Sequence, residues 1–404
     1  IKMDSHNAFT FSTIFHALDP DVFVDNHVSN GANYQYTLTY IAPVRERIPP
    51  ILRSLTYNHL IPELSADIKN NHGYDLFPYV DLKGKTPSEG IVSFNDLPRY
   101  SMGYTSLFNT ISFTVETHML KPFDSRVEAT YAFMKEIIDW SYMNSAIIEK
   151  SREEAHKYDL NQKSYYYNYR LSNKKDSILF KGYAHSFPIN KYTNQPRLLY
   201  DEKDPYELYI PWYKHYDYQD SMIVPEYYIV GYQEDDVIRR LKANKIKYRR
   251  VLNDSVLALG TYFIDDYKVF NSPYEGHFRL YDTKALESLK MVYLKKGDII
   301  VSSRQKGCRF IHSVLHPECE DSYFSWNFFD SYLQQKEYFS NYVFVENIEE
   351  ILLNNPALRD EFKEKKSLDE GFRNSEREQL DYIYKRSNYF EENTFKVLPI
   401  FYKP

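Results

Sequence analysis

The sequence predicts an α/β fold in which a mixed sheet flanked by helices is followed by a β-rich region with a helical C-terminal end. Two short apolar segments, 21–27 and 111–115, alternate with helical segments, as strands of such a sheet do. From 177 to 342 the pattern changes to short extended runs separated by turns. Helical periodicity returns over 347–386, so we expect helices after the β-rich region.

Length and the change of pattern together predict more than one structural unit. At about 150 residues per domain, 404 residues correspond to two or three domains. The segment 151–176 is charged and rich in tyrosine, and it separates the two patterns. We therefore expect a first domain over 1–150, a linker over 151–176 and an accessory domain over 177–404.

The first elements follow from periodicity and from the positions of proline. A helix is expected over 1–20, where Pro20 closes it, and a short buried strand follows over 21–27. Alternation predicts a second strand over 34–41. A helix is expected within 45–70, beginning near a Pro-Pro pair that suits a first helical turn.

The second part of the first domain repeats this order. Pro78, Gly84, Pro87 and Gly90 make 73–98 mostly loop with short extended pieces. A second apolar strand runs over 111–115 and ends in Glu116-Thr117-His118. An amphipathic helix is expected over 125–149, with an apolar stripe near 3.6-residue spacing at Tyr131, Met134, Ile138 and Tyr142.

In the accessory domain the sequence predicts extended runs interrupted by one clear helix. The expected strands include 227–230, 256–263 and 298–302. The interrupting helix is expected over 235–245, and the terminal helices over 347–365 and 375–386.

Composition excludes several functional classes. The chain has 50 basic and 56 acidic residues, a net charge of −6, and it lacks the basic surplus of a nucleic-acid-binding protein. With 12 glycines and no glycine-rich phosphate motif, it has neither the dinucleotide fingerprint nor the P-loop. Cys308 and Cys319 are its only cysteines, too few for a disulfide framework or a multi-cysteine zinc site. No apolar run approaches the roughly 18 residues of a membrane span.

Two strands end in residues that are able to do chemistry. His27 follows Asp25 at the end of one strand, and Glu116 ends another. A histidine held by a strand is placed to ligate a metal, and a glutamate held in the same way is able to act as a general base for metal-bound water. A hydrogen-bonded histidine and a salt-bridged glutamate are the alternative interpretation, and spacing alone favours it.

The amino-acid sequence around these residues resembles that of one protein family. Four segments carry the resemblance: DPDVFVDNHVSNG (19–31), RYSMGY (99–104), SFTVETHMLKP (112–122) and SRVEAT (125–130). In this order they resemble zinc metallocarboxypeptidases of the M14 type, particularly large bacterial members. The resemblance covers 1–150 densely and extends loosely to 321–329.

The resemblance implies roles for individual residues. It implies that His27 is the third zinc ligand and that Glu116 is the catalytic glutamate, which takes a proton from zinc-bound water and returns it to the leaving amine. Asn30, Tyr100 and Tyr104 are candidates for a substrate pocket, although each also has a structural interpretation. The implied cofactor is zinc, the implied substrate is a peptide or peptide-like molecule, and a periplasmic or secreted location would fit the family.

The sequence also departs from the family pattern. The first two zinc ligands, an H-x-x-E pair, and an Asn-Arg pair for the substrate carboxylate belong upstream, but only 26 residues precede His27. No histidine here has a glutamate three positions later. We expect the chain to be the C-terminal portion of a longer enzyme, inactive alone. The alternatives are a non-catalytic binding protein and a hydrolase of a non-peptide acyl amide or ester.

A second cluster of ligand-type residues is interpreted as structural. His312, His316, Glu318 and Cys319 form H-x-x-x-H-x-E-C, which binds a metal only if the two histidines share a helix face. The region is predicted to be extended, with Pro317 breaking it, so we expect no metal site there.

Overall fold

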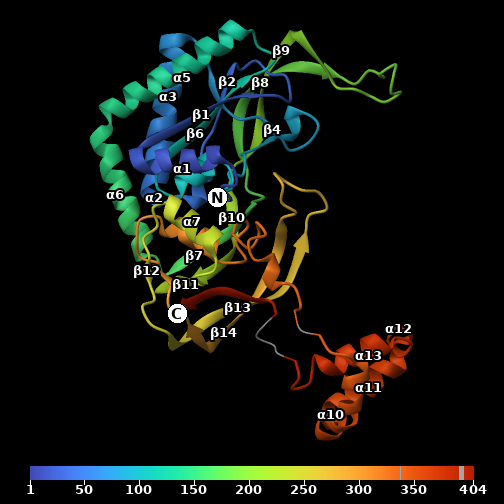
Figure 1. Cartoon of the computed structure of the whole chain (residues 1–404). Coiled ribbons are helices and arrows are strands. Elements are labelled where there is room, and N and C mark those ends of the chain that lie inside the picture. The colour runs from blue at the N-terminus through green and yellow to red at the C-terminus, as the bar shows by residue number, and fades with distance from the viewer. Residues whose placement is uncertain (337, 391–394) are drawn as a thin grey trace.

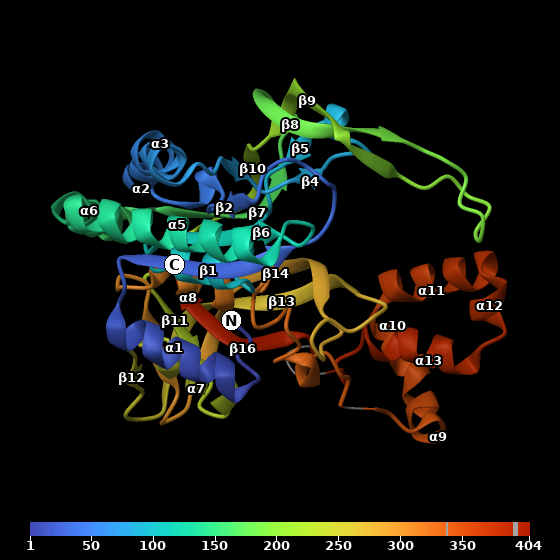
Figure 2. The ribbon, with the colours of Figure 1, turned by 90° about the horizontal axis from the view of Figure 1, so that it is seen from above.

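The computed structural model describes residues 1–336, 338–390 and 395–404 and confirms the predicted fold class (Figure 1). Helices cover one face of a mixed sheet near the N-terminus, and a larger antiparallel sheet dominates the rest. A group of helices near the C-terminus projects away from both sheets (Figures 1 and 2).

The first sheet has the strand order β1-β6-β2-β3. Strand β1 (Val22–Ser29) is parallel to β6 (Ile111–His118), which is antiparallel to β2 (Leu38–Ile41), and β2 is parallel to β3 (Leu76–Pro78). The sheet is therefore mixed, and β1 lies at its edge. Both apolar segments that predicted strands are confirmed, and β6 continues three residues further than expected.

The helices around this sheet begin and end for local reasons. Ser5 caps the N-terminus of the first helix by accepting a hydrogen bond from the backbone of Ala8, and Asp19 ends that helix in a left-handed conformation. The bounds are α1 (His6–Leu18), α2 (Pro50–Ser54), α3 (Ile61–His72), α4 (Ser101–Ser106), α5 (Phe123–Met143) and α6 (Ser145–Asn161).

The helix predicted within 45–70 contains a wide turn. A short 3₁₀ turn (Arg45–Arg47) precedes it, and a π-helical segment (Leu55–Leu60) joins α2 to α3. Pro62 stands in the first turn of α3, where its ring lacks an N–H and would clash with the carbonyl four residues earlier. The wider turn accommodates that proline, which explains why one periodic segment forms three pieces.

Alternation along β6 places apolar side chains on the face that packs against the helices and Glu116 on the opposite face. Ile111, Phe113 and Val115 point into a core with Phe133 of α5 and side chains of α2, α3 and α6. Because strand side chains alternate, Glu116 points to the opposite face, which α4 partly covers. The helical layer thus leaves Glu116 on the side that faces the rest of the molecule.

Helix α5 buries a different stripe from the predicted one. Its buried side chains include Ala129, Phe133, Ile137 and Trp140. Three members of the predicted stripe were wrong: Tyr131, Ile138 and Tyr142 are exposed, as is Val127 beside them. The fourth member, Met134, is partly buried and packs against the core. Both stripes have helical spacing, so periodicity alone does not identify the packed face. The predicted helix over 125–149 is also divided at Asn144 into α5 and α6.

Three further sheets follow. Strands β7 (Ser164–Leu171) and β10 (Tyr216–Ile223) form a two-stranded sheet. A four-stranded sheet has the order β4-β5-β9-β8. Its strands are β4 (Asp81–Leu82), β5 (Ile91–Val92), β8 (Asp176–Ser186) and β9 (Leu199–Tyr213). The predicted linker over 151–176 thus consists largely of the end of α6 and of β7.

The large sheet has the order β12-β15-β11-β16-β13-β14. Its strands are β11 (Tyr227–Val230), β12 (Arg249–Arg250), β13 (Ser255–Val269), β14 (Leu280–Leu294), β15 (Ile299–Ser302) and β16 (Val397–Lys403). Helices α7 (Asp235–Ala243) and α8 (Cys308–Leu315) pack against it in a core that also includes Phe15 of α1 and Tyr104 of α4. One hydrophobic core therefore joins residues from both predicted domains.

The projecting helices have a small core of their own. It contains Phe344, Leu380, Ile383 and Tyr384. The helices are α9 (Asn341–Phe344), α10 (Ile348–Asn354), α11 (Pro356–Leu368), α12 (Glu370–Arg373) and α13 (Glu376–Tyr384). These helices confirm the predicted helical end, although the chain then returns to the large sheet as β16.

Candidate functional site

Strands β1 and β6 bring His27 and Glu116 side by side. The two residues are direct partners in the parallel register of these strands. Partners in register place their side chains on the same face of a sheet, and here this is the face opposite the helical core. The sequence predicted that both residues end strands; each strand continues for two more residues, and the two strands are neighbours.

A carboxylate orients the ring of His27. The Nε2 atom of His27 lies 3.0 Å from Oδ1 of Asp25, which precedes it by two residues on the same face of β1. The His27 side chain is 49% exposed, and no described residue bonds its Nδ1 atom. A carboxylate that holds one ring nitrogen is the usual support for a histidine that ligates a metal through the other.

Ser101 at the start of α4 is the third member of this chain of contacts. Its hydroxyl donates to Oδ2 of Asp25 over 2.5 Å. The order is serine, aspartate, histidine, so the aspartate separates the hydroxyl from the imidazole. In a catalytic triad the histidine stands between the other two groups. Ser101 is therefore placed to orient Asp25 rather than to act as an activated nucleophile.

Glu116 has an unsatisfied carboxylate oxygen. Its Oε2 atom is buried and has no hydrogen-bond partner among the described residues. Burial raises the pKa of Glu116; the electrostatic interaction with His27 opposes this effect, and the interaction with Asp25 adds to it. A carboxyl group with a raised pKa beside a histidine suits the transfer of a proton.

Tyr34 forms part of the wall beside Glu116. Its hydroxyl lies close to Ser29 and Thr39, and burial raises the pKa of Tyr34 to about 12. The ring of His118 contacts the loop that carries Tyr34, with its Nε2 atom 2.9 Å from the carbonyl oxygen of Ala32. Tyr34 therefore places a neutral phenol near Glu116.

The three predicted pocket residues lie in different environments. Asn30 is exposed in the turn after β1. Tyr100 is half-buried and packs edge-on against Phe94, with ring centroids 5.1 Å apart. The hydroxyl of Tyr104 is buried and donates to Asn244 over 2.6 Å, away from the contacts of His27. A role for these residues in substrate binding stays a prediction.

The residues at the site fit a zinc ion incompletely. Catalytic zinc sites use three protein ligands and an open position for water. Among residues 1–336, 338–390 and 395–404, no group of three or more histidine, cysteine, aspartate or glutamate side chains is arranged to hold a metal ion. His27 offers one nitrogen ligand, supported by Asp25, and the described part of the chain does not complete the set.

The second ligand-type cluster is committed to protein partners, and its predicted extended conformation was wrong. Residues 308–315 form α8, and His316 is the cap that follows it. Nδ1 of His316 lies 3.3 Å from the hydroxyl of Tyr262, and Nε2 lies 3.0 Å from that of Tyr167. Both ring nitrogens are thus engaged in the core, so neither is left to bind a metal.

Asp25 and Ser101 are the site residues that the sequence did not assign a role. Asp25 was detectable, because two-residue spacing on a strand places it on the face of His27. Ser101 lies 76 residues from Asp25 along the chain, and only the packing of α4 on β1 brings the two together.

No family model, curated protein or solved structure matches this chain. The resemblance to metallocarboxypeptidases accordingly stays a prediction based on the motifs. In the described part of the chain, no helix combines the length and the apolar character that crossing a bilayer requires.

Proposed function

We propose that His27 and Glu116 belong to a hydrolytic centre that cleaves a C-terminal peptide bond or a related amide, as in metallocarboxypeptidases. The observation that carries this proposal is their in-register placement on neighbouring parallel strands, with one oxygen of Glu116 buried and unpaired. The family motifs imply this pair of roles independently of the geometry.

In this proposal Glu116 transfers a proton from the attacking water to the leaving amine. Its ionised form takes a proton from the attacking water, and its protonated form gives that proton to the leaving amine. The raised pKa of Glu116 favours holding the proton between the two steps. General acid–base catalysis of this kind contributes about 10²- to 10⁴-fold to the rate.

His27 is proposed as one metal ligand, with Asp25 fixing its ring. Because Asp25 engages Nε2, the Nδ1 atom carries the lone pair that would reach a metal. Zinc is assigned no step here, since the described residues supply a single nitrogen ligand. The whole set of ligands would have to include groups beyond those described at this site.

The test combines metal content with turnover. Both measurements use the product of the complete gene, because the described residues supply a single nitrogen ligand. Zinc would be measured by elemental analysis of the dialysed protein, of its His27→Ala variant and of His59→Ala, a control at an exposed histidine. Release of C-terminal residues from peptides would be measured for the same protein, for Glu116→Gln and for the exposed control Glu149→Gln. The proposal expects a loss of zinc in His27→Ala only and a loss of about 10²-fold or more in Glu116→Gln only. Equal behaviour of each variant and its control would contradict it.

The second candidate is a binding protein without turnover. The observation that favours it is the incomplete ligand set in the described part of the chain. Peptide binding at equilibrium without zinc and without cleavage would identify this function. Cleavage of acyl amides or esters, with peptides left intact, would identify a non-peptide hydrolase on the same scaffold.

A further inference from the structure

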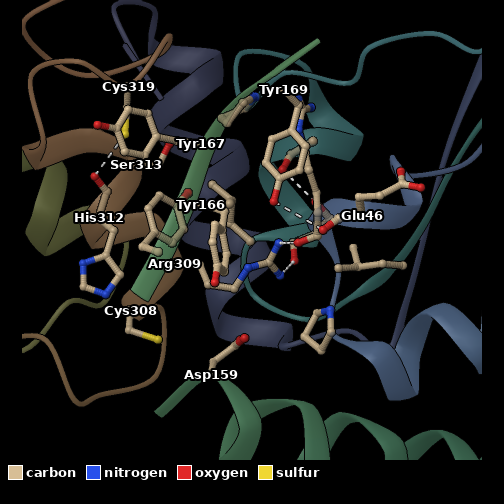
Figure 3. Close-up of a pocket in the computed structure, with 18 of the residues that line it drawn as sticks. Glu46, Asp159, Tyr166, Tyr167, Tyr169, Cys308, Arg309, His312, Ser313 and Cys319 are labelled. Atoms are coloured by element: carbon tan, nitrogen blue, oxygen red, sulfur yellow. Dashed lines mark hydrogen bonds between the residues drawn. The ribbon is translucent and has the colours of Figure 1, made fainter. Parts of the chain in front are cut away.

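A separate hollow lies where the 3₁₀ turn at 45–47, helices α6 and α8 and strand β7 meet (Figure 3). The space between its lining residues, open solvent included, is about 1030 Å³. Neither His27 nor Glu116 lines it. Three arginines do, namely Arg47, Arg53 and Arg309, and the tyrosines of β7 form one wall.

Arg309 is a buried cation without an anionic hydrogen-bond partner. It is 8% exposed, and it donates to the carbonyl of Ser106 at 2.9 Å, to the side-chain oxygen of Asn109 at 3.3 Å and to the carbonyl of Arg47. All three acceptors are neutral. Among the described residues, Arg309 forms no salt bridge, so its charge is compensated only at longer range.

Arg53 has a buried donor that makes no hydrogen bond to a described residue. Its Nε atom is buried and lacks a hydrogen-bond partner within the described part of the chain. Arg47, by contrast, lies 3.5 Å from a carboxylate oxygen of Asp96 and stacks over the ring of Tyr169. One of the three guanidinium groups is therefore paired, and two are left to act on whatever enters the hollow.

The three arginines all act electrostatically on one side chain, that of Tyr169. Burial raises the pKa of Tyr169, and the charges of Arg309, Arg47 and Arg53 all oppose this rise. A common effect on one phenol places the three groups within electrostatic range of the same hydroxyl. Figure 3 shows Arg309 and Tyr169 on the same side of the hollow, with Tyr166 close by.

The acidic residues in the lining mostly have partners of their own. Glu46 contacts His215 at 3.4 Å, and Asp321 pairs with Arg99 at 2.8 Å. Asp159 accepts from Asn109, and its charge partly offsets that of Arg309. Arg53 and Arg309 are therefore the lining cations that have no carboxylate partner among the described residues, in a half-enclosed place where unpaired charge is costly.

The geometry points to a ligand-binding site for a small molecule with an oxyanionic group, such as a phosphate or a carboxylate, held by Arg53 and Arg309. Guanidinium groups bind both oxyanions through charge-assisted hydrogen bonds. The aromatic wall of Tyr165, Tyr167 and Tyr169 would contact an apolar or planar part of the ligand. This site is independent of the proposed hydrolytic centre.

Calorimetric titration of the full chain tests the site. The probes are phenyl phosphate, benzoate, inorganic phosphate and phenol, which separate the anion from the ring. We expect phenyl phosphate or benzoate to bind with a Kd of about 1 mM or lower, more tightly than inorganic phosphate and phenol. Preference between phenyl phosphate and benzoate identifies a phosphate or a carboxylate ligand.

Variants identify the residues. Arg53→Gln should weaken binding roughly 10- to 100-fold, because it removes a charged donor. Arg359→Gln, a control on the projecting helix α11, should leave binding unchanged. Arg309→Lys keeps a positive charge where truncation would endanger the fold, and it should weaken binding less than Arg53→Gln. Binding by none of the probes, or equal binding by Arg53→Gln and the Arg359→Gln control, would overturn the proposal.

Discussion

Replacing Asp96 with asparagine tests the electrostatics of a carboxyl group buried beside the arginine hollow. Asp96 is 1% exposed. Its Oδ1 atom accepts from the backbone of Val44 at 2.9 Å and lies 3.5 Å from Nη1 of Arg47. Its Oδ2 atom has no hydrogen-bond partner among the described residues. Asparagine keeps the shape and an acceptor oxygen, and it removes the ionisation.

The expected magnitude follows from the pKa. Burial raises the pKa of Asp96 from 3.8 to about 6, against the opposing charge of Arg47. A difference of about 2 in pKa corresponds to about 3 kcal/mol of unfolding free energy. Because the folded chain holds this proton more tightly than the unfolded chain, the contribution to stability falls as the pH rises from about 4 to about 6.

The assay is urea unfolding of the wild type and Asp96→Asn at several values of pH across this range. The free energy of unfolding of the variant minus that of the wild type should increase by about 2 kcal/mol between pH 4 and pH 7, most of the full difference. Asp360→Asn, at an exposed position of α11, should show no such trend. A difference that is constant with pH, or that decreases, would refute the reasoning.

Three further substitutions have defined outcomes. Phe113→Ala empties a fully buried site between β6 and α5 and should cost about 3 to 5 kcal/mol of unfolding free energy in urea titrations. Gly103→Ala places a Cβ 2.3 Å from two backbone carbonyl oxygens and should lower the Tm, whereas Gly371→Ala meets only a side-chain oxygen at 3.5 Å and should not lower it. Glu116→Gln should be more stable than the wild type at neutral pH and lose this advantage near pH 4, because burial raises the pKa of Glu116; an advantage that grows on acidification would contradict this sign.

Elements with a local cause were predictable from the sequence. The strand predicted over 227–230 is β11, and the helix predicted over 235–245 is α7, which ends two residues earlier. An apolar run defines the strand, and charged first and last turns define the helix, in both cases without reference to the rest of the fold. The same holds for β1, which begins with an apolar run and ends in polar residues.

Features that depend on distant contacts were not predictable. The helix over 308–315 was missed because Pro317 was interpreted as a break, although a proline after the last turn is compatible with a helix. The choice of buried face on α5 depends on what packs against it, since both stripes have the same period.

The candidate site shows the same division. The sequence placed His27 and Glu116 at strand ends, and the structure places each of them two residues before the end of its strand. Their register, His27 opposite Glu116, is a property of how β1 and β6 pair. The contact of Ser101 with Asp25 likewise depends on the packing of α4 against the sheet. Sequence patterns thus identified the chemical groups, and tertiary structure determined which of them meet.

The edge position of β1 has a consequence for the behaviour of the purified chain. In the described structure β1 pairs with β6 alone, so an eight-residue strand presents its other flank to solvent. The exposed stripe of α5, with Val127, Tyr131, Ile138 and Tyr142, adds an uncovered apolar surface. Open strand edges and apolar patches both promote self-association. Light scattering should therefore rise steeply with protein concentration. Replacing Tyr142, the most exposed of the four, with a charged residue should reduce this rise without disturbing the core.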